Sequence, residues 1–300
     1  MNLIALFLGL ILERVLTKML HLRDLRWFDR YFDWGFSQMR GRGKAVCLLI
    51  GLFMVLLPCL PFAIIAIYFS HLLGGVPYLA FAAIVLLFSL GPRDLGSEVE
   101  DYCKAVEAGD QETSRRVAKE LLEEDAPRRA AARDRALEDA VFVQANNRLF
   151  GVIFWFIIAG PVGAWLFRVM DLMRRRAQFE AWRDGKVDPE ELDFLSAAKR
   201  LHWLLAWVPS RLLALGYALA GSFEDAVADW RSYYQECSPH FFDANEDVVA
   251  CVGKGALALD GLDDNQAQVG RLRAAMRLVN RTFFIWITVI SLITLFGWVL

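Results

Sequence analysis

Long apolar segments without charged side chains alternate with charged segments along the 300 residues of this chain. The clearest apolar segment is 282–300, which follows an arginine-rich stretch. A helix needs about 20 apolar residues to cross the hydrocarbon core of a bilayer, and basic residues beside a span favour the cytoplasmic side. The pattern predicts a C-terminal transmembrane anchor over 282–300, with the preceding arginines in the cytoplasm.

The N-terminal part of the chain predicts a helical hairpin in the membrane. Ala45–Phe69 is long enough to span a bilayer, and its two prolines, Pro58 and Pro61, predict kinks. Ser70–Pro77 is rich in glycine and predicts a tight turn. The apolar segment Tyr78–Leu90 then returns along the first arm.

The first apolar helix, Asn2–Met19, carries two ionisable residues. Its fully apolar part is only about 11 residues long, which is too short to span a bilayer alone, and it ends at Glu13 and Arg14. An ionisable side chain at bilayer depth is costly and commonly functional. Two interpretations stay open: Glu13 and Arg14 lie at bilayer depth or in a cavity, or the helix ends near the interface and both are solvated.

The segment His21–Lys44 interleaves arginines with six aromatic residues: Trp27, Phe28, Tyr31, Phe32, Trp34 and Phe36. Such interleaving occurs in proteins that stack nucleic-acid bases. The net charge of the whole chain is only −2, however, and gives no positive field that would attract nucleic acid. We therefore expect no nucleic-acid partner, and a helix in the cytoplasmic interface with its rings in the headgroup layer.

Two charged regions show helical periodicity. The segment VEDYCKAVEAGDQETSRRVAKELLEED (99–125) has apolar residues three and four positions apart, and Gly109–Asp110 indicates a turn between two helices. Residues 221–281 predict a second region of this kind. Strand patterns are negligible along the chain.

Two further apolar segments contain helix-breaking residues. Leu149–Phe167 is interrupted by Gly160–Pro161, and Leu201–Leu219 contains Pro209. Basic residues flank Leu149–Phe167 at both ends, so a simple span would place one basic cluster outside. We therefore expect broken, re-entrant helices that line a cavity, where irregular backbone is tolerated at membrane depth. A plain span over Leu149–Phe167 is the alternative.

Together these segments predict an all-α, polytopic membrane protein with kinked and re-entrant helices and a cytoplasmic helical portion. The predicted location is the bacterial inner membrane, with several passes, so the lipid bilayer is the first expected partner. The N-terminus, 70–77 and Leu300 are expected outside, and 91–281 mainly inside. The predicted parts are the N-terminal membrane helices with the basic-aromatic segment (1–91), a cytoplasmic helical region (92–148), the broken helices (149–220), a second cytoplasmic helical region (221–281) and the anchor (282–300).

Composition agrees with this fold and narrows the chemistry. Hydrophobic residues make up 56% of the chain and charged residues 23%, and the mean hydropathy is +0.35, so spans are combined with soluble surface. The five cysteines form no CxxC pair and the four histidines are scattered, so we expect no metal site and no cofactor. Standard phosphate-binding, dinucleotide, zinc-protease and hydrolase motifs do not occur, and no catalytic residue is assigned.

Three local patterns, in their order along the chain, carry a family resemblance. They are ANNRLFGVIFWFIIAGPVGAWLFRVMD (145–171), WVPSRL (207–212) and CSPHFFDANEDVVACVGKGALAL (237–259). The chain resembles the CobD/CbiB family of polytopic enzymes, which join an aminopropanol phosphate to adenosylcobyric acid in cobalamin synthesis. Its length, its first apolar stretch ending in Glu13–Arg14 and its C-terminal anchor are most similar to an inner-membrane regulatory branch linked to β-lactamase regulation.

The same resemblance indicates which enzyme residues are changed. A histidine-proline-valine motif that follows the first helix in the enzymes is replaced here by LHLRDLRWF (20–28). Their Glu-Asn pair before the broken helix reads Val143–Gln144, and the Asp that follows this pair reads Asn147. Their Asn-Thr-x-Asp pattern after the helix reads Asp171–Leu172–Met173–Arg174. Amide ligation of a phosphorylated amine needs acids for a divalent metal and donors for phosphate. Most of these acids are replaced, so the resemblance implies a retained scaffold without ligase chemistry.

Polar residues that match the family imply a ligand pocket. Arg168 and Arg211 each border a broken apolar helix and could hold a small anionic or amide-bearing ligand by charge-assisted hydrogen bonds. In the alternative interpretation, these arginines anchor the protein at the interface or pair with local acids. Ser238 and Pro239 also match the family, and Glu138, Asn146 and Asn147 could complete such a pocket. The full candidate set is Arg168, Arg211, Ser238, Asn146, Asn147 and Glu138.

Two functions follow from the resemblance. The first is a non-catalytic membrane sensor or transducer linked to β-lactamase induction, which acts with a small ligand or a regulatory protein partner. The second is an active ATP- or metal-dependent amide synthase related to adenosylcobinamide-phosphate synthase. The first is preferred because the acids are replaced. Assembly into a homo-oligomer is left open.

Overall fold

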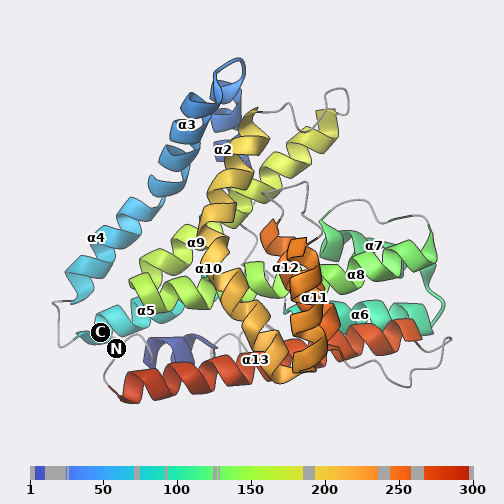
Figure 1. The fold of residues 1–300 in the computed structure, drawn as a ribbon. Helices are drawn as coiled ribbons and strands as arrows, with labels where there is room; N and C mark the ends of the chain where they lie inside the picture. The colour runs from blue at the N-terminus through green and yellow to red at the C-terminus, as the bar shows by residue number, and fades with distance from the viewer. Residues whose placement is uncertain are drawn as a thin grey trace. The chain divides into compact units, whose positions relative to one another are not determined.

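A computed structural model describes residues 4–10, 25, 27–70, 75–91, 94–123, 127, 129–184, 193–235, 244–257 and 267–296. Every regular element within these ranges is helical and no strand occurs in them, which confirms the all-α prediction (Figure 1). Residues 4–10 are helical. The labelled helices are α2 (Trp27–Met39), α3 (Lys44–Leu56), α4 (Cys59–Ser70), α5 (Val76–Ser89), α6 (Leu95–Glu107), α7 (Gln111–Leu122), α8 (Ala130–Ala145), the π-helical turn η3 (Asn146–Phe150), α9 (Gly151–Asp184), α10 (Asp193–Ala220), α11 (Phe223–Gln235), α12 (Ala244–Ala256) and α13 (Ala267–Leu295).

Within the described ranges, four helical stretches are long and apolar enough to cross a membrane. They are Lys44–Ser70, Ala132–Ala181, Asp193–Ala220 and Val269–Thr294. Helix α5 is a shorter apolar helix. These stretches confirm the prediction of a helical membrane protein.

The chain divides into two compact units. The first contains residues 1–92 and 151–206, and the second contains residues 93–150 and 207–300. One boundary falls between η3 and α9, and another falls inside α10. Each unit has its own hydrophobic core.

In the first unit, the phenylalanines of α2 belong to this core. Phe28, Phe32 and Phe36 recur every four residues and therefore share one helix face. They are at most 4% exposed and pack with α3 and α9. The prediction that the aromatic rings lie in the headgroup layer is wrong for these three, because a four-residue repeat supplies a packing face. For Trp27 and Trp34, which are exposed, it stays a prediction.

The predicted hairpin is present in the first unit. Proline removes a backbone donor and interrupts a helix, and the backbone turns at Leu57–Pro58 between α3 and α4. Gly75 then adopts a left-handed conformation (φ 85°) before α5, which a residue without a side chain adopts at little cost. Helix α5 packs against α4 and α9.

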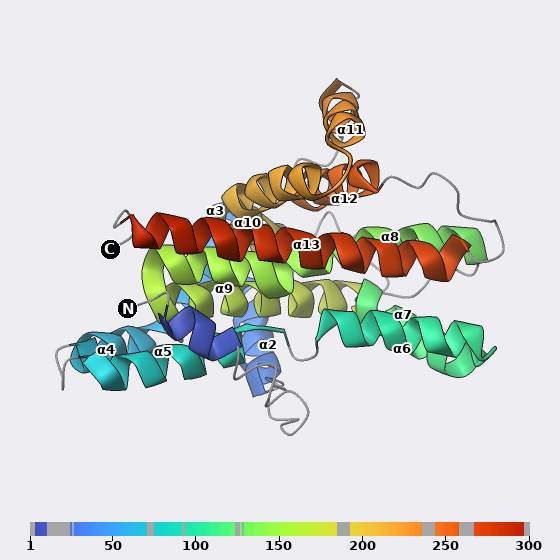
Figure 2. The same ribbon diagram turned by 90° about the horizontal axis from the view of Figure 1, so that it is seen from below.

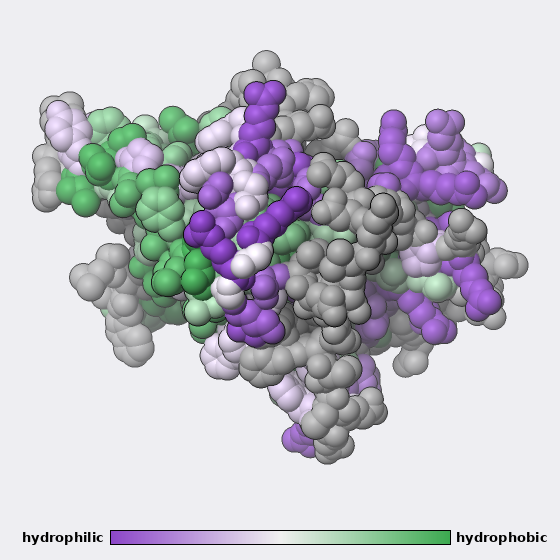
Figure 3. Space-filling model, turned by 90° about the horizontal axis from the view of Figure 1, so that it is seen from above, coloured by the Kyte–Doolittle hydropathy of each residue, from purple (hydrophilic) through white to green (hydrophobic). Residues whose placement is uncertain are grey.

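The outer side of α3 and α4 is apolar and exposed. Leu49, Phe53, Ile64 and Ile67 each have more than half of their surface exposed. A continuous apolar face of this kind marks a surface that meets lipid or protein. Figure 3 shows hydrophobic residues gathered at the left of its view. We interpret the α3–α4 face as lipid-facing.

Helix α9 is broken where the sequence predicted a break. Ala159 has φ −126° and ψ 16°, and Gly160 has φ 64° and ψ −153°, a combination that is essentially confined to glycine. A Cβ atom added at Gly163 would overlap the carbonyl oxygen of Trp155. In an uninterrupted helix, residues eight positions apart are separated by about 12 Å along the axis. The two arms of α9 therefore fold back on each other, and the chain reverses direction at the break (Figures 1 and 2).

Helix α10, in contrast, continues through Pro209 from Asp193 to Ala220. The expectation of an interruption at this proline is wrong. Proline removes one backbone donor and crowds the preceding turn, and flanking helical residues can tolerate that loss where the helix lies in a membrane or packs on neighbours.

In the second unit, the predicted cytoplasmic helices pack around a core of large side chains that includes Tyr102, Phe142 and Tyr217. The predicted turn at Gly109–Asp110 is confirmed. Asp110 is the N-cap of α7, and its carboxylate accepts hydrogen bonds from the backbone amides of Glu112 and Thr113.

Helix α13 joins the arginine-rich stretch and the first part of the predicted anchor in one continuous helix. Arg273, near its start, donates to Glu100 and Glu107 of α6 at 2.6–3.3 Å. The apolar part of the helix thus continues directly from a section that is tied to α6 by ion pairs.

Candidate functional site

The π-helical turn η3 contains two buried amide side chains in the second unit. Asn146 and Asn147 are 3% and 0% exposed, and Nδ2 of Asn146 donates to Oδ1 of Asn147 at 3.2 Å. Oδ1 of Asn146 and Nδ2 of Asn147 have no hydrogen-bond partner among the described residues. Isolated π-helical turns occur frequently at functional sites, and an unsatisfied buried amide requires an explanation.

The unused capacity of this pair does not depend on how the two amides are oriented. Each asparagine offers one carbonyl acceptor and one amino donor group, and the two orientations are not distinguished by shape. Whichever way both amides are turned, their mutual bond uses one donor and one acceptor. One donor and one acceptor remain, which is the complement of a further amide group.

A charged network connects η3 to α6 and to the end of α8. Nη1 of Arg148 donates to Oε2 of Glu98 on α6 at 2.7 Å, and Nε donates to Oε1 of Gln144 at 2.8 Å. Gln144 in turn donates to Glu123 at 2.6 Å. The arginine is 5% exposed and Glu98 is 4% exposed, so this network holds the asparagine pair in place through buried, charge-assisted bonds.

Neither Glu98 nor Arg148 was predicted from the sequence to be a site residue. One signal for Glu98 exists, because Leu95, Val99 and Tyr102 form the buried face of α6 and Glu98 lies on that face by its spacing. A charged residue on an apolar helix face predicts a buried partner. The identity of the partner, 50 positions later, has no local signal.

Among the residues that the structure describes, Arg211 on α10 in the second unit contacts only neutral groups. Its Nη1 donates to Oδ1 of Asn245 and, at 2.9 Å, to Oγ of Ser210, and its Nη2 donates to the hydroxyl of Tyr234 at 3.3 Å. The guanidinium carbon lies 5.6 Å from the centroid of the Trp207 ring. Four neutral partners orient the cation, and none of them neutralises its charge.

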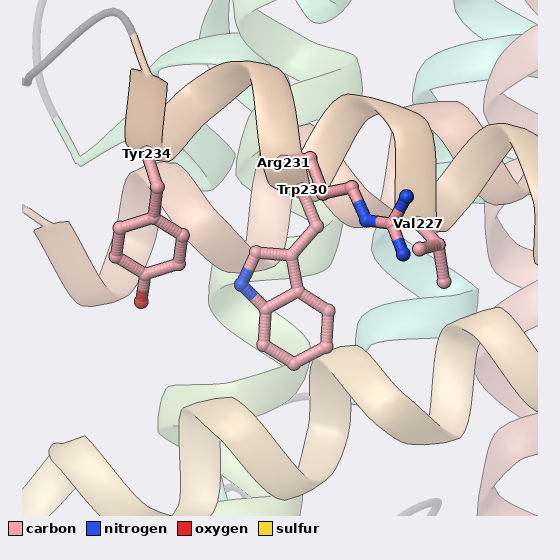
Figure 4. A pocket seen from close by; sticks show the side chains of 4 residues that line it. All are labelled: Val227, Trp230, Arg231 and Tyr234. Carbon is pink, nitrogen blue, oxygen red and sulfur yellow. The ribbon is translucent and has the colours of Figure 1, made fainter.

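A cavity of ≈ 360 Å³ lies on α11 (Figure 4). It is lined by Val227, Trp230, Arg231 and Tyr234. The last three lie three, four and seven residues after Val227, so all four share one helix face. Tyr234 therefore belongs both to the cavity and to the contacts of Arg211. The cavity is largely apolar, with one guanidinium on its rim.

In the first unit, three arginines surround one buried carboxylate. Arg168, Arg174 and Arg175 each place a nitrogen 3.1 Å from Asp171, which is fully buried. His202 of α10 is also buried and interacts electrostatically with Asp171. Arg168 thus pairs with a local acid, as the alternative interpretation expected, and a ligand-binding role for it stays a prediction.

The structure places the remaining candidates as follows. Arg168 belongs to the first unit, whereas Arg211, Asn146, Asn147 and Glu138 belong to the second. Asn146 and Asn147 are brought together. Glu138 is buried but precedes Asn146 by eight helical residues, about 12 Å along the axis, and interacts electrostatically with Arg271 and Lys254 instead. Glu13, Arg14 and Ser238 lie outside the described residues.

No group of three or more histidine, cysteine or acidic side chains in the described part of the chain could hold a metal ion. The polar groups that are brought together are amides, arginines and single carboxylates. Their common chemistry is hydrogen bonding and charge pairing with a ligand or with each other.

Comparison with known proteins identifies the family. The family model described as "Regulatory signalling modulator protein AmpE" matches residues 1–300. The cobalamin biosynthesis protein CobD of Stutzerimonas stutzeri is 32% identical over 210 residues, which is 68% of this chain and 63% of that protein. The CobD of Chromobacterium violaceum is 27% identical over 226 residues, 67% of each chain. This chain thus spans less than two thirds of the first relative's length.

No solved structure matches this chain. The two relatives confirm the resemblance to the CobD/CbiB family, and the family model covers every residue. The chain is a membrane protein related to CobD, and it belongs to the AmpE family of regulatory signalling modulators.

Proposed function

We propose that this protein is an inner-membrane regulatory modulator, linked to β-lactamase induction, that binds a small amide-bearing ligand and does not carry out ligase chemistry. The family supports the regulatory role. The observation that carries the ligand class is the Asn146–Asn147 pair, which leaves one buried donor and one buried acceptor without a hydrogen-bond partner among the described residues. A ligand amide would satisfy both, and a site built to hydrogen-bond an amide discriminates strongly against ligands that lack one.

The absence of ligase chemistry is proposed from the sequence. The positions at which the related enzymes carry acids read Val143–Gln144 and Asp171–Leu172–Met173–Arg174 here. Asp171 stands where the enzymes carry an asparagine, and their acid at the end of this pattern reads Arg174. The carboxylate of Asp171 is shared by three arginines. Signal output would pass to a regulatory protein partner, or to a second copy of the chain.

The test replaces the asparagines in cells that carry an inducible β-lactamase. Asn146→Leu with Asn147→Leu removes the unused donor and acceptor while keeping similar side-chain volumes. We expect β-lactamase induction to be lost or made constitutive while the protein is present in the membrane at normal levels. Gln111→Leu, at an exposed position on α7, is the control. Normal β-lactamase induction in the double variant would contradict the proposed amide-binding site.

The anion contacts expected from the sequence are tested separately. Arg168→Ala with Arg211→Ala is expected to remove the regulatory output without loss of insertion. Arg168 is engaged by Asp171, so each single variant is measured as well. Unchanged output in the double variant contradicts an anion-binding role.

One observation favours a second function. The two relatives described above are named cobalamin biosynthesis proteins, so an active amide synthase is the alternative. Complementation of a strain that lacks its cobalamin ligase decides between them: restored cobalamin synthesis supports the enzyme, and failure at normal protein levels supports the modulator. Purified protein that binds a nucleotide together with Mg²⁺ would also favour the enzyme.

A further inference from the structure

Helices α10 and α11 form a basic and aromatic surface that the amide site at Asn146–Asn147 does not include. We define the α10–α11 groove by Arg211 on α10 and by Trp230, Arg231 and Tyr234 on α11. The hydroxyl of Tyr234 accepts from Arg211, and the other two residues line the cavity beside it (Figure 4). All four residues belong to the second unit.

The two arginines of this groove have no acidic partner in the described part of the chain. The contacts of Arg211 are to Asn245, Ser210, Tyr234 and Trp207, all of which are neutral. Arg231 is exposed and rims the cavity. The nearest acid on its helix face, Glu224, precedes it by seven residues, about 10 Å along the axis. The groove therefore presents two positive charges to a ligand.

The charge lies next to an apolar strip. This strip lies on the same side of α10 as Arg211, and its side chains are 40–59% exposed. It consists of Trp207, Val208, Leu212, Leu215 and Leu219. Helix α10 is also long and apolar enough to lie in a membrane. A guanidinium on such a strip is costly unless it reaches the polar layer or draws polar groups toward it. Trp207, Trp230 and Tyr234 are of the residue types that collect at headgroup depth.

We propose that the α10–α11 groove binds the phosphate of an anionic phospholipid, whose acyl chain lies along the apolar strip of α10. Charge complementarity selects the ligand, because guanidinium groups bind phosphate through parallel charge-assisted hydrogen bonds. The aromatic side chains fix the depth of the headgroup. Asn245, Ser210 and Tyr234 orient Arg211 before the lipid arrives, which lowers the cost of ordering it.

The experiment measures lipid retained by the full-length protein. Protein reconstituted in vesicles of equal parts phosphatidylcholine and phosphatidylglycerol is extracted in mild detergent, and bound lipid is counted by native mass spectrometry. We expect the wild type to retain phosphatidylglycerol selectively. Arg211→Gln and Arg231→Gln should each weaken retention about fivefold, the effect of one basic residue at an anionic membrane surface. Arg115→Gln, an exposed arginine on α7, should leave it unchanged.

Arg231→Gln keeps the test valid if Arg211→Gln disturbs α11. Arg211 makes several hydrogen bonds that its substitution removes, whereas Arg231 makes no hydrogen bond or ion pair in the described part of the chain. Selective loss in Arg231→Gln supports the proposal. Equal retention of phosphatidylglycerol by the wild type, Arg231→Gln and Arg115→Gln overturns it.

Two further outcomes also overturn the lipid assignment. If inorganic phosphate at low concentration displaces the lipid completely, the groove is a free-phosphate site. If phosphatidylglycerol is not retained and an acidic partner protein binds over the groove instead, its two arginines form a protein interface. The measurement is independent of β-lactamase induction, so its failure leaves the amide site at Asn146–Asn147 untouched.

Discussion

Nη1 of Arg148 lies 2.7 Å from Oε2 of Glu98, and the two side chains are 6% and 5% exposed. This buried ion pair joins α6 to the π-helical turn that carries Asn146 and Asn147. Gln144 receives a second bond from the same guanidinium. The orientation of the asparagine pair thus depends on a contact between residues 50 positions apart.

Removing one partner of this pair should strongly destabilise the second unit. Glu98→Ala removes the carboxylate 2.7 Å from a buried guanidinium and leaves that guanidinium with Glu123 at 3.9 Å. Breaking such a buried pair costs about 3–5 kcal/mol of unfolding free energy. Asp139→Ala breaks the ion pair between Asp139 and Lys254, whose side chains are 38% and 42% exposed, respectively. The loss of this exposed pair should cost only about 0–1 kcal/mol. Denaturant unfolding in detergent micelles measures both. Equal losses would contradict the structural role of the Glu98–Arg148 pair.

Substitution of Gly160 should destabilise the fold of α9. Its φ of 64° with ψ of −153° is strained for any side chain, so Gly160→Ala should cost about 1–3 kcal/mol. Gly43 has φ −65° and ψ 156°, and a Cβ there meets nothing within 4 Å. Gly43→Ala should therefore cost less than about 1 kcal/mol. Thermal unfolding of the two variants compares them, and a milder effect at Gly160 would contradict the break.

The breaks and spans that were predicted correctly depend on local chemistry. Gly160–Pro161 is recognisable because only glycine readily adopts the conformation that the reversal needs. The start of α7 is recognisable because Asp110 caps it. At Pro209 the same local reasoning was wrong, since proline weakens a helix but its surroundings decide whether the helix ends.

The residues that were missed depend on distant contacts. Phe28, Phe32 and Phe36 look like interfacial aromatics in isolation. They belong to the core because they pack with α3 and α9, and Phe36 also stacks on Phe194 of α10. Glu98 and Arg148 come into contact because α6 packs on the end of α8, and no local sequence pattern predicts this packing. The acid beside Arg168 is different, because Asp171 lies three residues later, a spacing that places both on one helix face.

Membrane topology remains a prediction that reporter fusions can test. Because the arms of α9 fold back at Gly160, its two ends can lie on one side of the bilayer, and the region from 91 to 281 can stay mainly in the cytoplasm. A fusion at Gln111 should report the cytoplasm, and a fusion at Gly75 the periplasm. A periplasmic signal at Gln111 contradicts the re-entrant arrangement.

Removal of Asp171 should destabilise the first unit. Three guanidinium groups share this fully buried carboxylate, so Asp171→Ala should cost about 3–5 kcal/mol. Asp101→Ala, at an exposed position of α6, should stay within about 0.5 kcal/mol. The double variant Arg168→Ala with Asp171→Ala should lose less than the sum of the single losses, because the two residues are coupled. Additive losses in micelle unfolding would argue against the coupling.

Acid should weaken the attachment of α13 to α6 through Glu100. The hydrogen bonds from Arg273 hold the pKa of Glu100 below its ordinary value of 4.5. Because the folded pKa is lower than the unfolded one, the unfolded state binds the proton more readily. The stability from this contact is therefore fully present above about pH 4.5 and is lost as the pH falls through the folded pKa. Unfolding midpoints measured from neutral pH into acid should show a steeper acid loss for the wild type than for Glu100→Gln, which should already be weaker at neutral pH. Glu112→Gln, an exposed position on α7, serves as the control. An acid dependence that is identical in the wild type and Glu100→Gln would show that Arg273 does not hold α6 through this carboxylate.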